Sequence, residues 1–261
     1  MIYLKKFETT NQYDAYTADT TNFIKPNVSF IEETRIVDYH PSEIDPYNGH
    51  EYVEIGGLKW ATMNVGATGV TDIGLYFQWG DTQGYTASQV GSGKGKKYFD
   101  WSDYKYWTSD TGSGSSGFTK YNSTDGKTVL DTSDDAVQAN WGGAWRMPTT
   151  DEYVALGNAI DFIDADGNII SGDKKRTTLS GVTGIYVADK TDHSKRLFFP
   201  AAGYCYDGIV DFPHSYGQYW SSSRVYSTVQ YAYGQGFANR NVNWQSRNDR
   251  YWGFAVRGVV G

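Results

Sequence analysis

The sequence predicts an α+β fold with many short strands and two helices. The chain of 261 residues contains 30 glycines and many clusters of turn residues, which are unusual in an all-helical protein. Aromatic residues make up 16% of the chain and carry much of its apolar mass. A hairpin pattern comes first, two helical patterns follow, and the remainder reads as short strands, which is the order of an α+β domain.

Residues 1–45 are expected to form a small N-terminal α/β module for attachment or assembly. Ile2–Phe7 and Val28–Tyr39 have strand patterns, and a short helix is expected to begin near Thr9. A segment of this size buries too little apolar surface to be stable alone. The following segment, 40–49, contains two of the six prolines and is interpreted as a linker.

A ligand-binding domain is expected over residues 46–261. Its first element is a β-hairpin over Tyr52–Trp60, because strand patterns flank a Gly-Gly turn. Gly91–Gly117 is rich in Gly, Ser and Lys, which indicates long surface loops. After Leu197 aromatic residues alternate with Gly, Ser, Asn and Arg, as short strands and exposed loops do.

Two helices are expected between the hairpin and the later strands. Ser133 is interpreted as the cap of a helix that runs through Trp141, with aspartates in its first turn. A second helix is expected to end near Ile160, and at its start Thr149 and Glu152 have the spacing of a capping box.

The charge balance argues against a nucleic-acid-binding protein. The chain has 23 basic and 30 acidic residues, a net charge of −7 and an isoelectric point near 5.1, whereas nucleic-acid binders are basic. No apolar stretch is long enough to span a membrane, and Met1–Glu8 lacks the apolar core of a secretory signal. We therefore expect a soluble protein that does not insert into membranes.

The sequence offers weak candidates for a metal site. Asp164–Gly167 begins like a calcium loop, but Ile169 stands where that loop requires glycine, so a hairpin turn is preferred. His50-Glu51 begins like a zinc-protease motif, but Glu54 stands where the second histidine is required. We expect no metal ion and no cofactor.

A catalytic site is likewise not expected. Cys205, the one cysteine, lies between two tyrosines in an apolar run, which favours an inert buried thiol over a nucleophile. The alternative is an enzyme of the formylglycine-generating type, with Cys205 at a cleft.

The tail of the chain differs from the rest in composition. Leu197–Gly261 contains no Lys, Glu or Met, and its charged residues are five Arg and three Asp. Tyr, Ser, Asn and Arg recur between small residues, as they do in antibody paratopes. The run Ser246–Arg250 is too polar and charged to be expected in a core. The candidate ligand-binding residues are Arg224, Tyr226, Ser227, Tyr231, Tyr233, Asn239, Arg240, Asn241, Asn243, Ser246, Arg247, Asn248, Asp249 and Tyr251.

A series of blocks in residues 50–261 resembles, in the same order, the blocks of a C-type-lectin-fold family related to formylglycine-generating enzymes. The blocks are Gly57–Ala67, Gly74–Asp81, Asp135–Ala136, Trp141–Thr149, Phe199–Tyr204, Tyr219–Ser223 and Gly253–Arg257. The resemblance implies a C-type lectin fold in which two helices accompany short antiparallel sheets.

Within that family, the tail resembles the variable proteins of diversity-generating retroelements. In those proteins reverse transcription rewrites adenines in a cassette that ends at a Gly-Phe-x-Val-Arg block. The resemblance implies a hypervariable region over about residues 216–252, which binds changing protein or glycan targets on a cell surface in a receptor-binding or adhesin role. Rewritten codons yield neither Gln nor Trp, so these residues are expected to be constant: Gln230, Gln235, Gln245, Trp220, Trp244 and Trp252.

The resemblance extends to the setting of the protein. The first 40 residues resemble leaders of phage-borne proteins, which implies that they bind a virion or assembly partner and that the binding domain lies on a phage tail or another extracellular surface. A host cell-surface protein is one alternative to this setting. A structural virion or cell-surface component without diversification is an alternative function.

Overall fold

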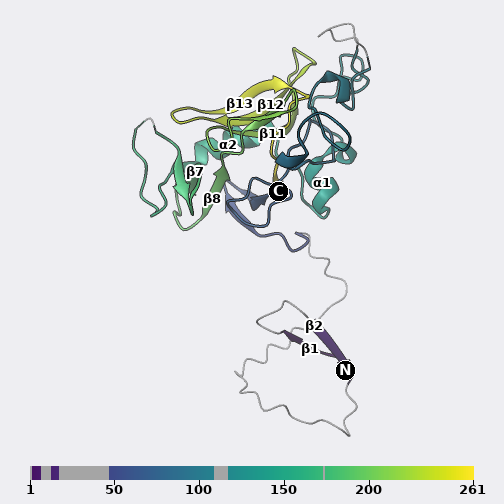
Figure 1. The fold of residues 1–261 in the computed structure, drawn as a ribbon. Coiled ribbons are helices and arrows are strands. Elements are labelled where there is room, and N and C mark those ends of the chain that lie inside the picture. The colour runs from purple at the N-terminus through teal and green to yellow at the C-terminus, as the bar shows by residue number, and fades with distance from the viewer. Residues whose placement is uncertain (1, 7–12, 18–46, 109–116, 173) are drawn as a thin grey trace, which may run out of the picture. The chain divides into compact units, whose positions relative to one another are not determined.

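A computed structural model describes most of the chain (Figure 1). The described residues are 2–6, 13–17, 47–108, 117–172 and 174–261. The chain divides into two compact units, residues 1–43 and 44–261.

In the first unit, β1 (Ile2–Lys6) pairs with β2 (Tyr13–Thr17) in antiparallel register. The expected helix is therefore wrong at residues 13–17, which form a strand. Its expected start near Thr9 and the expected strand Val28–Tyr39 lie outside the described residues.

The second unit is a β-rich fold, so the α+β expectation is wrong. Its described residues form several small antiparallel sheets and only two α-helices, α1 (Ala136–Trp141) and α2 (Thr150–Ala159). The correction applies equally to the helix-plus-sheet arrangement of the C-type lectin fold that the resemblance implied. Two short helices cannot form a layer over several sheets, and most core contacts come from strands and the loops that join them.

The first sheet confirms the hairpin expected at the Gly-Gly turn. Gly56 and Gly57 both have positive φ values, +62° and +82°, a conformation that glycine adopts without strain. The last strand of the chain joins this hairpin, giving the order β14-β4-β3. The strands are β3 (Tyr52–Ile55), β4 (Leu58–Asn64) and β14 (Arg257–Val260).

Two further sheets lie in the middle of the sequence. One has four antiparallel strands, β5 (Ile160–Phe162), β6 (Thr177–Leu179), β7 (Val182–Asp189) and β8 (Arg196–Pro200). In it β7 pairs with each of the other three. The other is the small hairpin of β9 (Tyr204–Tyr206) and β10 (Ile209–Asp211).

The polar tail forms a separate three-stranded antiparallel sheet in the order β11-β12-β13. Its strands are β11 (Gly217–Arg224), β12 (Tyr231–Phe237) and β13 (Val242–Asp249). Figure 1 shows these strands side by side, with α2 next to them.

The caps of the two helices were predicted with different success. At α2 the capping box is confirmed: the Thr149 hydroxyl accepts from the Glu152 amide at 3.2 Å, and the Glu152 carboxylate accepts from the Thr149 amide at 2.7 Å. At α1 the cap is Asp135, whose carboxylate accepts two backbone N–H groups of the first helical turn, and Ser133 instead lies in a short 3-10 turn. Both residue types suit the cap position, so composition alone does not distinguish them.

The sheet of the tail is fixed to the core by two tryptophans that donate to each other's segment. Trp79 Nε1 donates to the Ser221 carbonyl at 2.9 Å, and Trp220 Nε1 donates to the Phe77 carbonyl at 2.8 Å. Both indoles are completely buried, and Trp220 stacks on Phe254 with ring centroids 4.0 Å apart. These contacts hold β11 rigidly against the segment around residue 78.

Arg257 joins three strands from within the core. Its guanidinium is completely buried and donates to the side chain of Asn64 at 2.8 Å. It also donates to the carbonyls of Ala61 and Phe198, each at 2.9 Å. A buried cation is tolerated here because its donors have acceptors and because it lies over the Phe199 ring at 4.6 Å.

We expect Arg257→Ala to lower the free energy of unfolding by about 3–5 kcal/mol, since it leaves three buried acceptors without a donor and creates a cavity. Chemical denaturation of the variant measures this loss. Arg240→Ala is the control, because Arg240 is exposed and its removal is expected to change stability by no more than about 0.5 kcal/mol. Equal stability of the two variants would contradict the central role of Arg257.

Candidate ligand-binding surface

The sheet of the tail has a packed side and an exposed side along β13. Val242 and Trp244 pack against the core, whereas Asn243, Gln245 and Arg247 are exposed. Trp244 lies so close to α2 that a Cβ atom at Gly157 would come within 2.4 Å of its Nε1 atom. The helix therefore fixes the orientation of β13 and leaves alternate side chains in solvent.

Seven of the fourteen candidate residues are exposed. They are Tyr226, Ser227, Asn239, Arg240, Asn241, Asn243 and Arg247, and we call them the tail surface. Tyr226 has the highest exposure of any large apolar side chain described, 82%.

Five candidates are half-buried: Tyr231, Tyr233, Ser246, Asp249 and Tyr251. Tyr231 pairs with Asp249 in the sheet, and Tyr233 pairs with Arg247. The Arg247 guanidinium also lies over the Tyr233 ring at 5.7 Å. Tyr251 belongs to neither pair, and its ring contacts that of Trp101, with the ring centroids 4.7 Å apart.

Two candidates are buried, so the expectation that they face a ligand directly is corrected. Asn248 is 8% exposed and donates to the Ser246 hydroxyl at 3.0 Å. Arg224 is 4% exposed and donates through Nε to the Lys127 carbonyl at 2.9 Å.

The expectation that the whole run Ser246–Arg250 avoids the core is also wrong. Arg250 is completely buried, with its guanidinium 4.0 Å from the centre of the Phe118 ring and also close to the rings of Trp79 and Tyr104. It donates to the Tyr121 carbonyl at 3.1 Å. The faces of these rings attract the cation. The rings come from other parts of the chain, so the composition of the segment around Arg250 does not predict its burial.

The tip of the β12–β13 hairpin is held by its backbone. The Ala238 amide donates to the Asn241 carbonyl at 2.8 Å, and the Lys175 amide donates to the Asn239 carbonyl at 3.1 Å. The side chains of residues 239–241 are exposed and take no part in these bonds. The loop around Lys175 thus supports the tip without using its side chains.

An open hollow of about 500 Å³ lies at the other end of the tail surface. Its lining consists of the β11–β12 loop and a turn from a distant part of the chain. The lining residues are Ser123, Gly126, Arg224, Tyr226, Ser227, Thr228, Val229 and Gln230. The turn was not predicted as part of the site, because Ser123 and Gly126 carry no signal that separates them from other loop residues.

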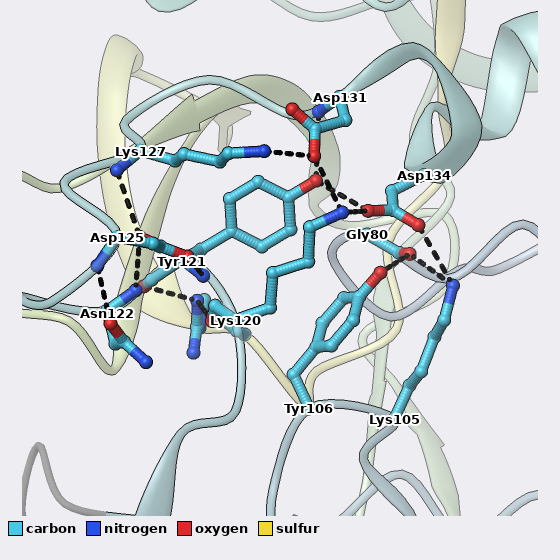
Figure 2. A network of polar contacts seen from close by, with 11 residues as sticks. Gly80, Lys105, Tyr106, Lys120, Tyr121, Asn122, Asp125, Lys127, Asp131 and Asp134 are labelled. Atoms are coloured by element: carbon cyan, nitrogen blue, oxygen red, sulfur yellow. Dashed lines mark hydrogen bonds and ion pairs between the residues drawn. The ribbon is translucent and has the colours of Figure 1, made fainter.

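A network of charged and phenolic side chains holds this turn in place (Figure 2). Lys120 contacts both Asp134 and Asp131, and Tyr121 donates to Asp134 at 2.6 Å. Burial alone would raise the pKa of Asp134, but these hydrogen bonds outweigh burial and hold it well below its usual range. Asp134 is therefore charged at neutral pH and can pair with Lys120.

Asp125 shapes the turn itself. Its carboxylate accepts the backbone N–H groups of Tyr121, Asn122 and Lys127 at 2.6, 3.0 and 3.0 Å. Figure 2 shows this carboxylate beside Asn122, within the network. Because its neighbours are backbone groups of the turn, the wall of the hollow is rigid.

Cys205 is buried, as the sequence predicted. Burial raises the pKa of its thiol, so the reactive thiolate is disfavoured. Because Cys205 is completely buried, the alternative that placed it at a cleft as a nucleophile loses its candidate residue.

The turn after Asp164 is the expected hairpin turn. The Asp164 carboxylate accepts the amides of Asp166 and Asn168, and Gly167 has a φ of +92°. Among the described residues, no group of three or more His, Cys, Asp and Glu side chains is arranged to hold a metal ion. No helix in the same part of the chain is long and apolar enough to cross a membrane.

Searches against protein-family models, curated proteins and solved structures found no match for the chain.

We expect the Cys205 thiol to resist alkylation in the folded protein, because it is buried and its thiolate is disfavoured. Mass spectrometry after iodoacetamide treatment at mildly alkaline pH measures the modification. The same protein in concentrated guanidinium chloride is the control and should be fully modified. Rapid alkylation without denaturant would show that the thiol is accessible.

Asp249 is expected to make the stability of the domain pH-dependent. Burial raises its pKa from 3.8 to about 6, and its carboxylate accepts no hydrogen bond from the described residues. The folded state therefore binds the proton more tightly than the unfolded state, and stability falls as the pH rises from about 4 to about 6.

Asp249→Asn removes this penalty. At neutral pH we expect the free energy of unfolding of the variant to exceed that of the wild type by about 1–2 kcal/mol. This range allows for the partial exposure of the carboxylate to solvent. Below about pH 4 we expect the two proteins to be equally stable. Denaturation at both pH values measures the difference. Asp207→Asn, at an exposed position, is the control. A pH-independent difference would rule out titration of Asp249 as the cause.

Proposed function

We propose that residues 44–261 form a ligand-binding display domain whose tail surface holds a macromolecular target without chemical turnover. We further propose that a diversity-generating retroelement rewrites the residues of this surface. The target would be a protein or glycan on a cell surface, and the role that of a receptor-binding protein or adhesin.

One observation carries the proposal: nearly all the exposed residues of the tail belong to four residue types, although residues of these types also occur in its core. Between Tyr219 and Trp252 eight residues are exposed, and seven of them form the tail surface. These seven are Tyr, Ser, Asn and Arg, the types expected from rewritten adenine codons. The eighth is Gln245. Trp220 and Gln235, which such rewriting does not produce, are completely buried.

Energetics supports the same division of roles. Exposed substitutions outside special sites change stability by about 0.5 kcal/mol or less, whereas interface energy concentrates in a few Tyr, Trp and Arg side chains. Trp79 and Trp220 fix the frame from inside, and Tyr226 and Arg247 lie in solvent. Binding can therefore change at residues on which folding does not depend.

For the setting, we propose a phage tail or another extracellular surface. The first unit, residues 1–43, would then attach the domain to a virion or assembly partner. This part of the proposal comes from the resemblance in sequence.

The genomic locus tests diversification. We expect a second copy of the codons for residues 216–252 beside a reverse-transcriptase gene, differing at adenines in the codons of the tail surface and identical at those of Trp220 and Gln235. Sequencing of the locus and its relatives provides the measurement. Differences spread evenly over buried and exposed codons would indicate a structural component that changes by drift.

Display of two libraries tests whether the surface tolerates change. Randomising the seven tail-surface residues should leave most variants folded and yield binders to unrelated protein targets. A matched library at buried positions, Ser221, Ser222, Ser223, Arg250 and Arg257, should lose folding in most variants. Protease resistance measures folding. Loss of folding in both libraries would contradict the proposed display role.

A further inference from the structure

We propose that the hollow beside the β11–β12 loop binds a carboxylated sugar at the end of a glycan, and that Arg224 holds its carboxylate. The inference rests on the proposed function, since Tyr226 and Ser227 belong to both the hollow and the tail surface. It names one ligand class for one end of that surface.

Arg224 is a buried cation without an ion pair among the described residues. Its side chain lines the hollow although the residue is only 4% exposed. Burial lowers the pKa of its guanidinium, and the nearby Asp125 opposes this effect only in part. Because a desolvated charge without a partner is costly, an anion in the hollow would be strongly attracted.

The guanidinium is oriented before any ligand arrives. Its Nε donates to the Lys127 carbonyl and its Nη1 to the Val225 carbonyl, each at 2.9 Å. Its Nη2 makes no hydrogen bond to any residue that the structure describes, so two N–H donors are left over. Fixed donors of this kind suit the planar oxygens of a carboxylate.

The rest of the lining suits a sugar. Ser123, Ser227 and Thr228 supply hydroxyl groups, and Gln230 supplies an amide. The exposed Tyr226 ring offers a flat apolar face to the C–H groups of a pyranose. A volume of about 500 Å³ lies within the range of small-ligand sites and accommodates a single sugar ring with its substituents.

The charge of the surroundings favours a monoanion. Asp125 is close enough to Arg224 to influence its pKa, and its own carboxylate is occupied by backbone N–H groups of the turn. A dianionic phosphate would bring two negative charges to a hollow that one guanidinium lines, and Asp125 lies near that guanidinium. A sugar carboxylate, with a single charge, matches the one cation that lines the hollow.

Titration of the full chain with N-acetylneuraminic acid and glucuronic acid, followed by NMR, tests the inference. We expect at least one of them to bind at least tenfold more tightly than its neutral counterparts, N-acetylmannosamine and glucose. Equal binding of acidic and neutral sugars, or no binding of either acid, would overturn the inference. Stronger binding of a short aspartate-containing peptide would also overturn it, in favour of a protein ligand.

Two variants at one exposed position separate charge from shape. Ser227→Asp puts a negative charge beside the proposed carboxylate and is expected to weaken binding roughly tenfold, or about 1.4 kcal/mol. Ser227→Asn removes the same hydroxyl and has nearly the size of aspartate without its charge, so it is expected to weaken binding by about threefold, clearly less than Ser227→Asp. Equal effects of both variants would place the anion elsewhere.

The display libraries distinguish this inference from the proposed function. If the exposed library yields binders while no acidic sugar binds the wild type, the inference about the hollow is wrong and the display role stands. If no acidic sugar binds the wild type and the exposed library loses folding, both the inference and the proposed function are wrong.

Discussion

The buried guanidinium of Arg257 is the constraint on which the arrangement of the sheets depends. It links β4, β8 and β14, which are far apart in the sequence, through hydrogen bonds that only a cation with several fixed donors can make together. Asn64, one of its acceptors, also donates to the hydroxyl of Tyr219 at 3.3 Å. The position of β11, and with it the sheet of the tail, is thus connected to the first hairpin of the domain.

The arginines of the tail have different structural roles, which depend on the residues that surround them. Arg250 and Arg257 are buried over aromatic rings and stabilise the frame, whereas Arg240 and Arg247 lie in solvent. Arg224 is intermediate, since backbone carbonyls hold two of its nitrogens while its Nη2 has no partner among the described residues. A residue type associated with interfaces therefore has to be located in three dimensions before its role is assigned.

Local signals in the sequence were the most reliable. The Gly-Gly turn, the capping box at Thr149 and the burial of Cys205 were predicted because each depends on neighbours along the chain. The fold class was wrong because helical patterns reveal that helices exist but not how little of the core they cover. Burial of Arg250 and the turn at Ser123 depend on contacts between distant segments, for which the sequence alone gives no pattern.

The backbone hydrogen bonds that support the β12–β13 tip determine which substitutions this loop tolerates. Both anchoring bonds end on amide and carbonyl groups that nearly every amino acid possesses. Proline at position 238 or 175 would break one of them, since it lacks the N–H group. Substitution of the side chains at residues 239–241 leaves both bonds in place, so the loop can change in sequence while its backbone keeps the same support.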